Sequence, residues 1–352
     1  MSALVGAFLL VMSQAGNAVT IAEAPLFIAA GTTPNVMLVV DNSGSMNSII
    51  WATGFDSRVT YPDWSPLVDH DCNTGTATRE AWAPTDSSVL PSSMTSTAWR
   101  GACAVNTTGT ACTAGKTRGR NAAGTVTKCL TLPDPLGGGG TTRYTGNYLN
   151  YLFNIYADNT VLNGGQIPND TRMNVARNVA TQVVTNNANL RLGLTRFNPP
   201  VTGDNGPGGR VIGNCATGNT ASLNTLIAAL TASTNTPLAE TLYEVTRYFR
   251  GMSSQFNAGV TYTSPILYRC QKNFVIVITD GYPTEDVSIP TNDPLDVANT
   301  SKALPNWDGL APATTAAMYP NFPQYSDGYQ PSGTQASEGF SLYLDDVAKF
   351  AF

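Results

Sequence analysis

An apolar run that ends in an acid and two hydroxyls constrains the fold more than any other feature of this sequence. Residues Val36–Val40 are all apolar and rich in valine, and Asp41, Ser43 and Ser45 follow at alternate positions. Such a run is typical of a strand that is buried on both faces, as in a parallel sheet covered by helices. These sheets bind ligands beyond the carboxyl ends of their strands, which is where Asp41 would lie.

The oxygen atoms of this segment suit a divalent cation. In an extended or tightly turning loop, the carboxylate and the two hydroxyls can converge on one point, and Gly44 allows the chain to turn. This set of hard oxygen ligands favours Mg2+, with Ca2+ or Mn2+ as alternatives. The same residue types are also ordinary turn formers, so the segment alone leaves both interpretations open.

Composition excludes several classes of function. The 352 residues suffice for one large α/β domain or two ordinary ones. The net charge of −5 gives no indication of a nucleic-acid partner or of a basic membrane-binding face. His70 is the only histidine, which disfavours histidine-rich zinc sites and catalytic arrangements such as Ser-His-Asp or Cys-His.

The N-terminus is interpreted as an export signal peptide over residues 1–18. The apolar run Ala3–Met12 is too short to cross a bilayer, and Gly16 and Ala18 have the spacing of a cleavage site after Ala18. No Lys or Arg precedes the apolar run, so we expect the true start of the protein to lie upstream.

The cysteines agree with an oxidising compartment, where disulfides persist. None of the six belongs to a CxxC pair, which disfavours a zinc site, and their pairing is left open. At least one bridge is expected within 72–129. The disulfide candidates are Cys72, Cys103, Cys112, Cys129, Cys215 and Cys270.

Residues 47–169 are interpreted as a long insertion tied by disulfides. Scattered tryptophans lie among polar residues, prolines and glycines, and no helical or alternating period persists, except that 148–156 predicts one aromatic helix. A structureless loop of this length would be unusual inside a compact domain. The aromatic residues could form a sugar-binding platform, but a small irregular module also needs them for its core, and we favour the core.

Regular patterns return after the insertion. Helical spacing predicts a helix over Thr171–Asn186 with Asp170 as its N-cap, and alternation predicts a strand over Arg191–Phe197. A short edge strand is expected over Gly208–Gly213, and a second helix over Thr220–Leu230.

The last two patterns complete the candidate site. Thr236 has the position of an N-cap before an amphipathic helix that starts around Pro237. The stretch Asn273–Gly281 repeats the pattern of a buried strand that ends in an acid and a turn, with Asp280 in the place that Asp41 has in the first run. Because alternating strands and helices imply a mainly parallel sheet, both acids should meet at one edge.

Five segments together resemble a von Willebrand factor A domain. They are DNSGSM at 41–46, TPLAETL at 236–242, VITDG at 277–281, and RMNVARNVA before LRLGLTRF. The resemblance covers about 35–46 and 170–286, and it implies a doubly wound, mainly parallel sheet flanked by helices within residues 19–352. It also implies a metal-ion-dependent adhesion site, whose metal keeps one coordination position open for an acidic group of a partner. The matching positions are Asp41, Ser43, Ser45, Thr236 and Asp280.

The long insertion and the sequence segments that flank it resemble, more narrowly, the PilY-type tip adhesins of type IV pili. This resemblance implies an exported protein of the periplasm, pilus tip or outer surface of a Gram-negative bacterium. It also implies roles in pilus biogenesis, attachment and twitching motility, with a pilus component or a host or surface protein as partner. PilY-type proteins carry a large C-terminal β-propeller, so the resemblance implies that the full-length protein has such a domain beyond this sequence.

The C-terminal residues are interpreted as a helix that stops inside the fold. Apolar residues of Gly339–Phe352 fall on one helical face, and no Gly, Asn or Pro stop signal follows. In an alternating α/β domain this helix should lead into another strand. We therefore expect a domain truncated at its C-terminus, with an unpaired sheet edge.

Two other classes of function stay open at this level. A metal-dependent hydrolase such as a phosphatase would also place an Asp at a strand end, but Ser43 occupies the second position of the DxDx pair, and no P-loop is present. No evident base or nucleophile accompanies the site, so we expect no enzymatic activity. A structural surface protein with a vestigial metal site is the other alternative.

Overall fold

The computed structural model describes residues 32–62, 64–65, 67–70, 77–80, 116–121, 126–137, 142–201, 205–281, 283–293, 304, 307 and 343–351. The expected signal peptide and three of the disulfide candidates, Cys72, Cys103 and Cys112, lie outside these residues. The chain divides into the units Met1–Thr32 and Thr33–Phe352, and the described residues from Thr33 onward belong to the second unit.

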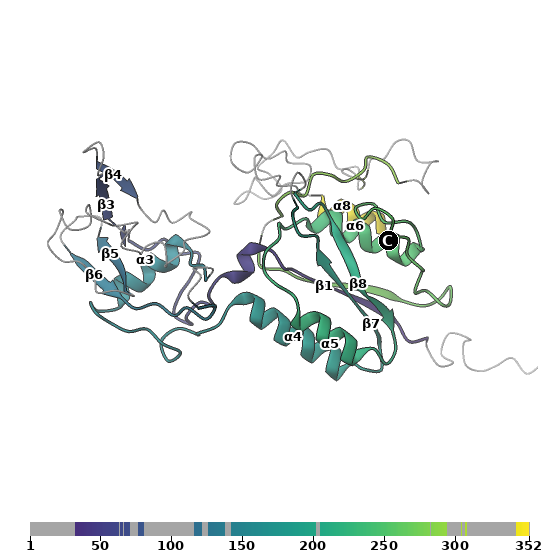
Figure 1. The fold of residues 1–352 in the computed structure, drawn as a ribbon, viewed down its shortest axis with the longest axis horizontal. Helices are drawn as coiled ribbons and strands as arrows, with labels where there is room; N and C mark the ends of the chain where they lie inside the picture. Colours follow the sequence, from purple (N-terminus) through teal and green to yellow (C-terminus); the bar gives the residue numbers. More distant parts are fainter. Residues whose placement is uncertain are drawn as a thin grey trace, which may run out of the picture. The chain divides into compact units, whose positions relative to one another are not determined.

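A four-stranded sheet in the order β8-β7-β1-β9 forms the framework of the α/β part of this unit (Figure 1). Strand β1 pairs in parallel with both β7 and β9, whereas β7 pairs antiparallel with β8. The strands are β1 (Asn35–Val40), β7 (Arg191–Phe197), β8 (Gly209–Ala216) and β9 (Asn273–Ile278). The sheet is therefore mixed and mostly parallel, which agrees with the predicted α/β class.

Helices cover both faces of the sheet, which explains why residues Val36–Val40 of β1 are all apolar. Successive side chains of a strand point to opposite faces. Val36, Leu38 and Val40 pack with α4 and α5, whereas Met37 and Val39 pack with α6 (Figure 1). The helices are α4 (Arg172–Asn186), α5 (Thr220–Ala228) and α6 (Leu238–Arg250). No helix in the described part of the chain has the length and apolar character needed to cross a membrane.

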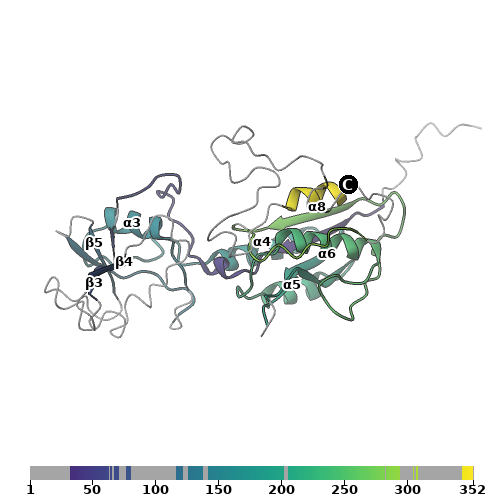
Figure 2. The ribbon, with the colours of Figure 1, turned by 90° about the horizontal axis from the view of Figure 1, so that it is seen from above.

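Helix α8 (Leu344–Ala351), which lies within the predicted C-terminal helix, lies beside α6 (Figure 2) and packs with Leu242 and Tyr243 of that helix. Strand β9 has β1 as its one neighbour among the described strands. The expectation that β9 is buried was wrong, because Phe274 is 48% exposed and Ile276 is 44% exposed. Its apolar sequence alone could not distinguish an edge strand from a central one.

The insertion contains a core of its own, built from aromatic side chains. Helix α3 (Gly146–Ile155) confirms the predicted aromatic helix, and Tyr144, Tyr148 and Phe153 are fully buried in this core. None of its strands was predicted: β2 (Trp64–Ser65), β5 (Thr117–Asn121) and β6 (Thr127–Leu130) form one sheet, and β3 (Leu67–His70) and β4 (Ala77–Glu80) form another. The described aromatic residues therefore serve mainly as core.

Two disulfide candidates are free thiols, which corrects the expectation for them. Cys215 lies on β8 and packs against Met37 and Phe197 inside the sheet core, whereas Cys270 is exposed. Burial raises the pKa of the Cys215 thiol to about 11, so the thiol stays protonated. Cys129 is disulfide-bonded, and the sulfur that pairs with it lies outside the described residues. The disulfide-tied character of the insertion stays a prediction.

Candidate metal centre

The ends of β1 and β9 bring the two predicted acids together. Val40 pairs with Ile278 in the parallel register of these strands, so Asp41 and Asp280 emerge from the same edge of the sheet. The amide of Asp41 continues the ladder by donating to the carbonyl of Ile278 over 2.8 Å. After Asp41 the chain enters the short helix η1 (Gly44–Asn47), which carries Ser45.

A continuous chain of hydrogen bonds links four of the five predicted residues. Asp41 Oδ1 accepts from the amide of Ser43 over 2.7 Å. The hydroxyls of Ser43 and Ser45 lie 2.8 Å apart, and the Ser45 hydroxyl donates to Asp280 Oδ1 over 2.8 Å. Asp41 Oδ2 accepts from the hydroxyl of Thr279 over 2.6 Å. Sequence reasoning missed Thr279, although its place directly before Asp280 at a strand end was a usable signal.

Asn42 fixes the loop that carries these residues, and it was also missed. Its side-chain oxygen accepts from the amide of Phe197 at the end of β7 over 2.8 Å. Its carbonyl accepts from the amides of Ser233 and Thr234, and the amide of Gly44 donates to the carbonyl of Thr234 over 2.9 Å. The segment before α6 therefore lies directly alongside Ser43.

Thr236 stands in this segment, but no hydrogen bond joins it to the other four predicted residues. Its amide donates to the hydroxyl of Thr284 over 3.0 Å, and its carbonyl accepts from the amides of Leu238 and Thr284. Its side chain is nearly buried, and its hydroxyl makes no hydrogen bond to any residue that the structure describes. This hydroxyl is therefore available to a ligand.

The expected capping role of Thr236 was wrong. Pro237 occupies the N-cap position of α6 and provides no side-chain cap. The amides of Ala239 and Glu240 instead donate to the carboxylate of Asp286, over 3.0 Å and 2.9 Å. A carboxylate suits this end of a helix, where free amides and the helix dipole favour negative charge.

The two acids differ in whether a basic side chain pairs with them. Asp41 is fully buried, and no basic side chain in the described residues pairs with it. Burial raises the pKa of Asp41, while the hydrogen bonds from Ser43 and Thr279 act in the opposite direction. Asp280, by contrast, accepts from Arg172 Nη1 over 2.7 Å. A cation at this edge would offset the uncompensated charge of Asp41.

The available ligands are carboxylates and hydroxyls. No group of three or more His, Cys, Asp or Glu side chains gathers anywhere in the described part of the chain. Any cation here would therefore be held by two carboxylates supplemented with hydroxyl oxygens. Such a set fits Mg2+ or Ca2+ and does not fit the nitrogen and sulfur preference of zinc.

Arg172 is a basic residue at the centre, and sequence reasoning missed its role. It is the first residue of α4, whose N-cap is Thr171 and not Asp170 as expected. The hydroxyl of Thr171 accepts from the amide of Asn174, while Asp170 accepts from the amide of Thr171. The helix starts one residue later than an Asp170 cap would place it, and the side chain of its first residue, Arg172, donates to Asp280.

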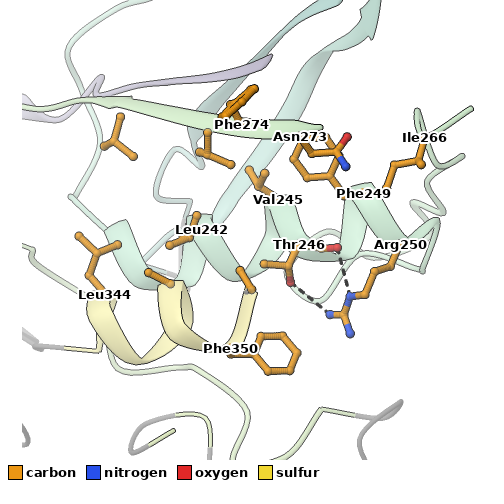
Figure 3. A pocket seen from close by; sticks show the side chains of 14 residues that line it. Leu242, Val245, Thr246, Phe249, Arg250, Ile266, Asn273, Phe274, Leu344 and Phe350 are labelled. Carbon is orange, nitrogen blue, oxygen red and sulfur yellow. Dashed lines mark hydrogen bonds between the residues drawn. The ribbon is translucent and has the colours of Figure 1, made fainter. Parts of the chain in front are cut away.

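A cavity of about 700 Å3 lies elsewhere, between α6, β9 and α8 (Figure 3). Its walls are mainly apolar and include Val245, Phe274 and Leu344, and none of the five predicted site residues lines it. The guanidinium of Arg250 donates to the carbonyl and hydroxyl of Thr246 beside it (Figure 3). This cavity is distinct from the candidate metal centre.

Glu240 is a buried acid on α6 outside the candidate metal centre, and its titration should make the free energy of unfolding depend on pH. It accepts from the amides of Gly208 and Ser288, both over 2.5 Å. Burial raises the pKa of Glu240 from 4.5 to about 7, and the two backbone hydrogen bonds only partly oppose this. The folded chain therefore binds this proton more tightly than the unfolded chain does.

The Glu240 contribution to stability is expected to be complete below about pH 4.5 and to be lost as the pH rises through about 7. The free energy of unfolding should fall by up to about 3 kcal/mol from this group, since one pKa unit corresponds to about 1.4 kcal/mol. Urea denaturation at about pH 5 and about pH 8 measures it. Glu240→Gln should flatten the dependence, and an equally steep fall in this variant would contradict the assignment.

Comparisons of the chain with family models, with curated proteins and with solved structures find no match.

Proposed function

We propose that this chain is an exported adhesion protein that binds an acidic group of a partner through a divalent cation. The cation would be held by Asp41, Ser43, Ser45, Thr236 and Asp280. The observation that carries this proposal is the fully buried carboxylate of Asp41, which has no basic partner among the described residues and joins a hydroxyl chain leading to Asp280. Mg2+ suits this ligand set best, with Ca2+ or Mn2+ as alternatives.

The residues around the centre would orient it. Thr279 and the amide of Ser43 hold the Asp41 carboxylate, and Asn42 ties the loop to β7 and to the segment before α6. When bound, the cation supplies an electrophilic position for a carboxylate of the partner. With two carboxylates and neutral hydroxyls around it, the cation would keep part of its positive charge for that partner.

The setting of this binding activity is proposed from the sequence. The motifs that resemble a von Willebrand factor A domain, together with the long insertion, support an adhesin associated with type IV pili. The partner would be a pilus component or a host or surface protein, and the role would include pilus biogenesis, attachment and twitching motility. Loss of cell attachment in a metal-site variant would separate this function from a structural role with a vestigial site.

The first test uses Thr236, because its hydroxyl is nearly buried and has no hydrogen bond to a described residue. Thr236→Val keeps the shape of the side chain and removes the proposed ligand, so its Mg2+ affinity should fall by about tenfold or more. Calorimetric titration with Mg2+, Ca2+ and Mn2+ measures the affinity. A parallel assay with a phosphate ester tests the hydrolase alternative and should give no turnover.

The matched control is Thr234→Val in the same segment. The Thr234 hydroxyl donates to the carbonyl of Asn235, so this variant loses one local hydrogen bond and no proposed ligand. Its Mg2+ affinity should stay within about twofold of the unmodified chain. If the unmodified chain binds none of the three cations at millimolar concentration, the proposed function is wrong.

A further inference from the structure

Two arginines border the loop that carries Ser43 and Ser45, and we propose that they form an anion clamp beside the cation. The clamp consists of Arg143 and Arg172. It lowers the affinity of the centre for the metal and raises its affinity for a partner segment with several carboxylates, such as an acidic peptide. This inference rests on the proposed function and deepens it, because it names the class of ligand.

Arg172 is held in place by contacts on two sides. Its Nη1 donates to Asp280 Oδ2 over 2.7 Å, while Ser45 occupies the other oxygen of that carboxylate. Its guanidinium carbon lies 5.0 Å from the ring centre of Trp51. A guanidinium that stacks on an aromatic ring and pairs with a carboxylate has a fixed orientation. Arg172 is therefore a fixed positive charge at one of the proposed metal ligands.

The position of Arg172 is unfavourable for its helix. It is the first residue of α4, and the N-terminal end of a helix carries a partial positive charge that repels cations. Helix stability therefore does not account for an arginine here. The Asp280 carboxylate and the Trp51 ring offset the repulsion, which ties Arg172 to the metal centre and not to the helix.

Arg143 lies on the other side of the same loop. A Cβ atom added to Gly44 would lie 3.3 Å from its Nη2, so the guanidinium stands directly over the backbone between the two serines. Its amide donates to the carbonyl of Asn47, and its carbonyl accepts from the amide of Ile49. The backbone of Arg143 is thus fastened to the loop that it flanks.

Both arginines keep N–H groups free for a ligand. Arg172 donates one hydrogen bond to Asp280, and its side chain is 21% exposed. The Arg143 side chain is partly exposed and makes no hydrogen bond or ion pair with any described residue. A guanidinium fork matches a carboxylate in two-point contact. A ligand with adjacent carboxylates could therefore engage the cation and the arginines together.

The clamp predicts opposite changes in two affinities. Like charges repel, so removing an arginine should favour the metal, and Arg172→Gln should also leave Asp280 free to bind it. Arg172→Gln and Arg143→Gln should each bind Mg2+ about three- to tenfold more tightly. At saturating Mg2+, both should bind a fluorescent hexa-aspartate peptide about tenfold more weakly, because the charge-assisted hydrogen bonds are lost.

Two further variants separate this role from a structural one. Arg177→Gln, on the same helix, removes an arginine that donates to the carbonyls of Ala228 and Leu230, and it should leave both affinities unchanged. Arg172→Lys keeps the charge but loses the fork, so Mg2+ affinity should stay as it is while peptide affinity falls. A hexa-asparagine peptide should not bind.

The outcomes decide between the two proposals. If both affinities fall together in Arg172→Gln and Arg143→Gln, or if neither changes, the clamp is wrong while the cation site stands. If the unmodified chain binds no cation, the proposed function fails and the clamp fails with it. Urea denaturation of each variant shows whether its fold is retained.

Discussion

Replacement of Asp41 by alanine is expected to lower the affinity for Mg2+ and for Ca2+ by at least about 100-fold. Asp41 is one of only two carboxylates in the proposed ligand set, and the other, Asp280, already pairs with Arg172. Asp280→Ala should have an effect of the same size, because it also breaks the hydrogen bond from the Ser45 hydroxyl. Calorimetric titration of both variants with each cation measures the loss.

The fold should survive the loss of Asp41. Alanine leaves the Ser43 amide and the Thr279 hydroxyl without their acceptor, and an unsatisfied buried donor costs about 1–3 kcal/mol. The substitution also removes a buried charge that has no basic partner among the described residues, which acts in the opposite direction. We therefore expect the free energy of unfolding to change by no more than about 2 kcal/mol.

The control for charge is Asp170→Ala. Asp170 lies just before α4 and accepts from the amide of Thr171 and the side chain of Asn174, and it is not a proposed ligand. Asp170→Ala removes the same negative charge as Asp41→Ala, so the cation affinity of this control variant should stay within about twofold of the unmodified chain. Unchanged affinity in both Asp41→Ala and Asp280→Ala would show that the cation binds elsewhere.

The sheet and its helices could be predicted because their signals are local. The run Val36–Val40 is apolar on both faces since α4 and α5 cover one face and α6 covers the other. The same reasoning placed Asp41 and Asp280 at one edge, where the Ser43–Ser45 hydroxyl pair does link them. The exposure of β9 could not be predicted, because its residues match those of a central strand.

The N-caps of α4 and α6 were mispredicted, and for α6 the reason is that its free amides are bound by a loop from elsewhere in the chain. Thr236 has the sequence position of a cap, but the amides of Ala239 and Glu240 bond to Asp286, a residue more than 40 positions away. Strand β2 of the insertion depends on an equally distant partner, since Trp64 pairs with Asn121 in a strand of two residues. A strand this short has no period to detect. Arg172 was missed for a related reason, because its partner Asp280 is far away in the sequence.

Tyr148→Ala is expected to lower the free energy of unfolding of the insertion core by about 3–5 kcal/mol. Tyr148 is fully buried, and its ring lies 4.8 Å from that of Phe55 and 6.1 Å from that of Tyr144, between ring centres. Its hydroxyl accepts from the amide of Ala52 over 2.8 Å. Alanine would leave a large cavity among rigid rings and one unpaired amide, and urea denaturation measures the loss.

Tyr148→Phe serves as the matched control, because it keeps the ring and removes only the acceptor for Ala52, at a cost of about 1–3 kcal/mol. A loss in Tyr148→Ala no larger than in this control would mean that the rings do not stabilise the insertion. The result also bears on the metal centre. Trp51 packs against the Tyr148 core and stacks on Arg172, which in turn holds Asp280. If the core orients Trp51 for this contact, Tyr148→Ala should change Mg2+ affinity in the same direction as Arg172→Gln, whereas Tyr148→Phe should leave it unchanged.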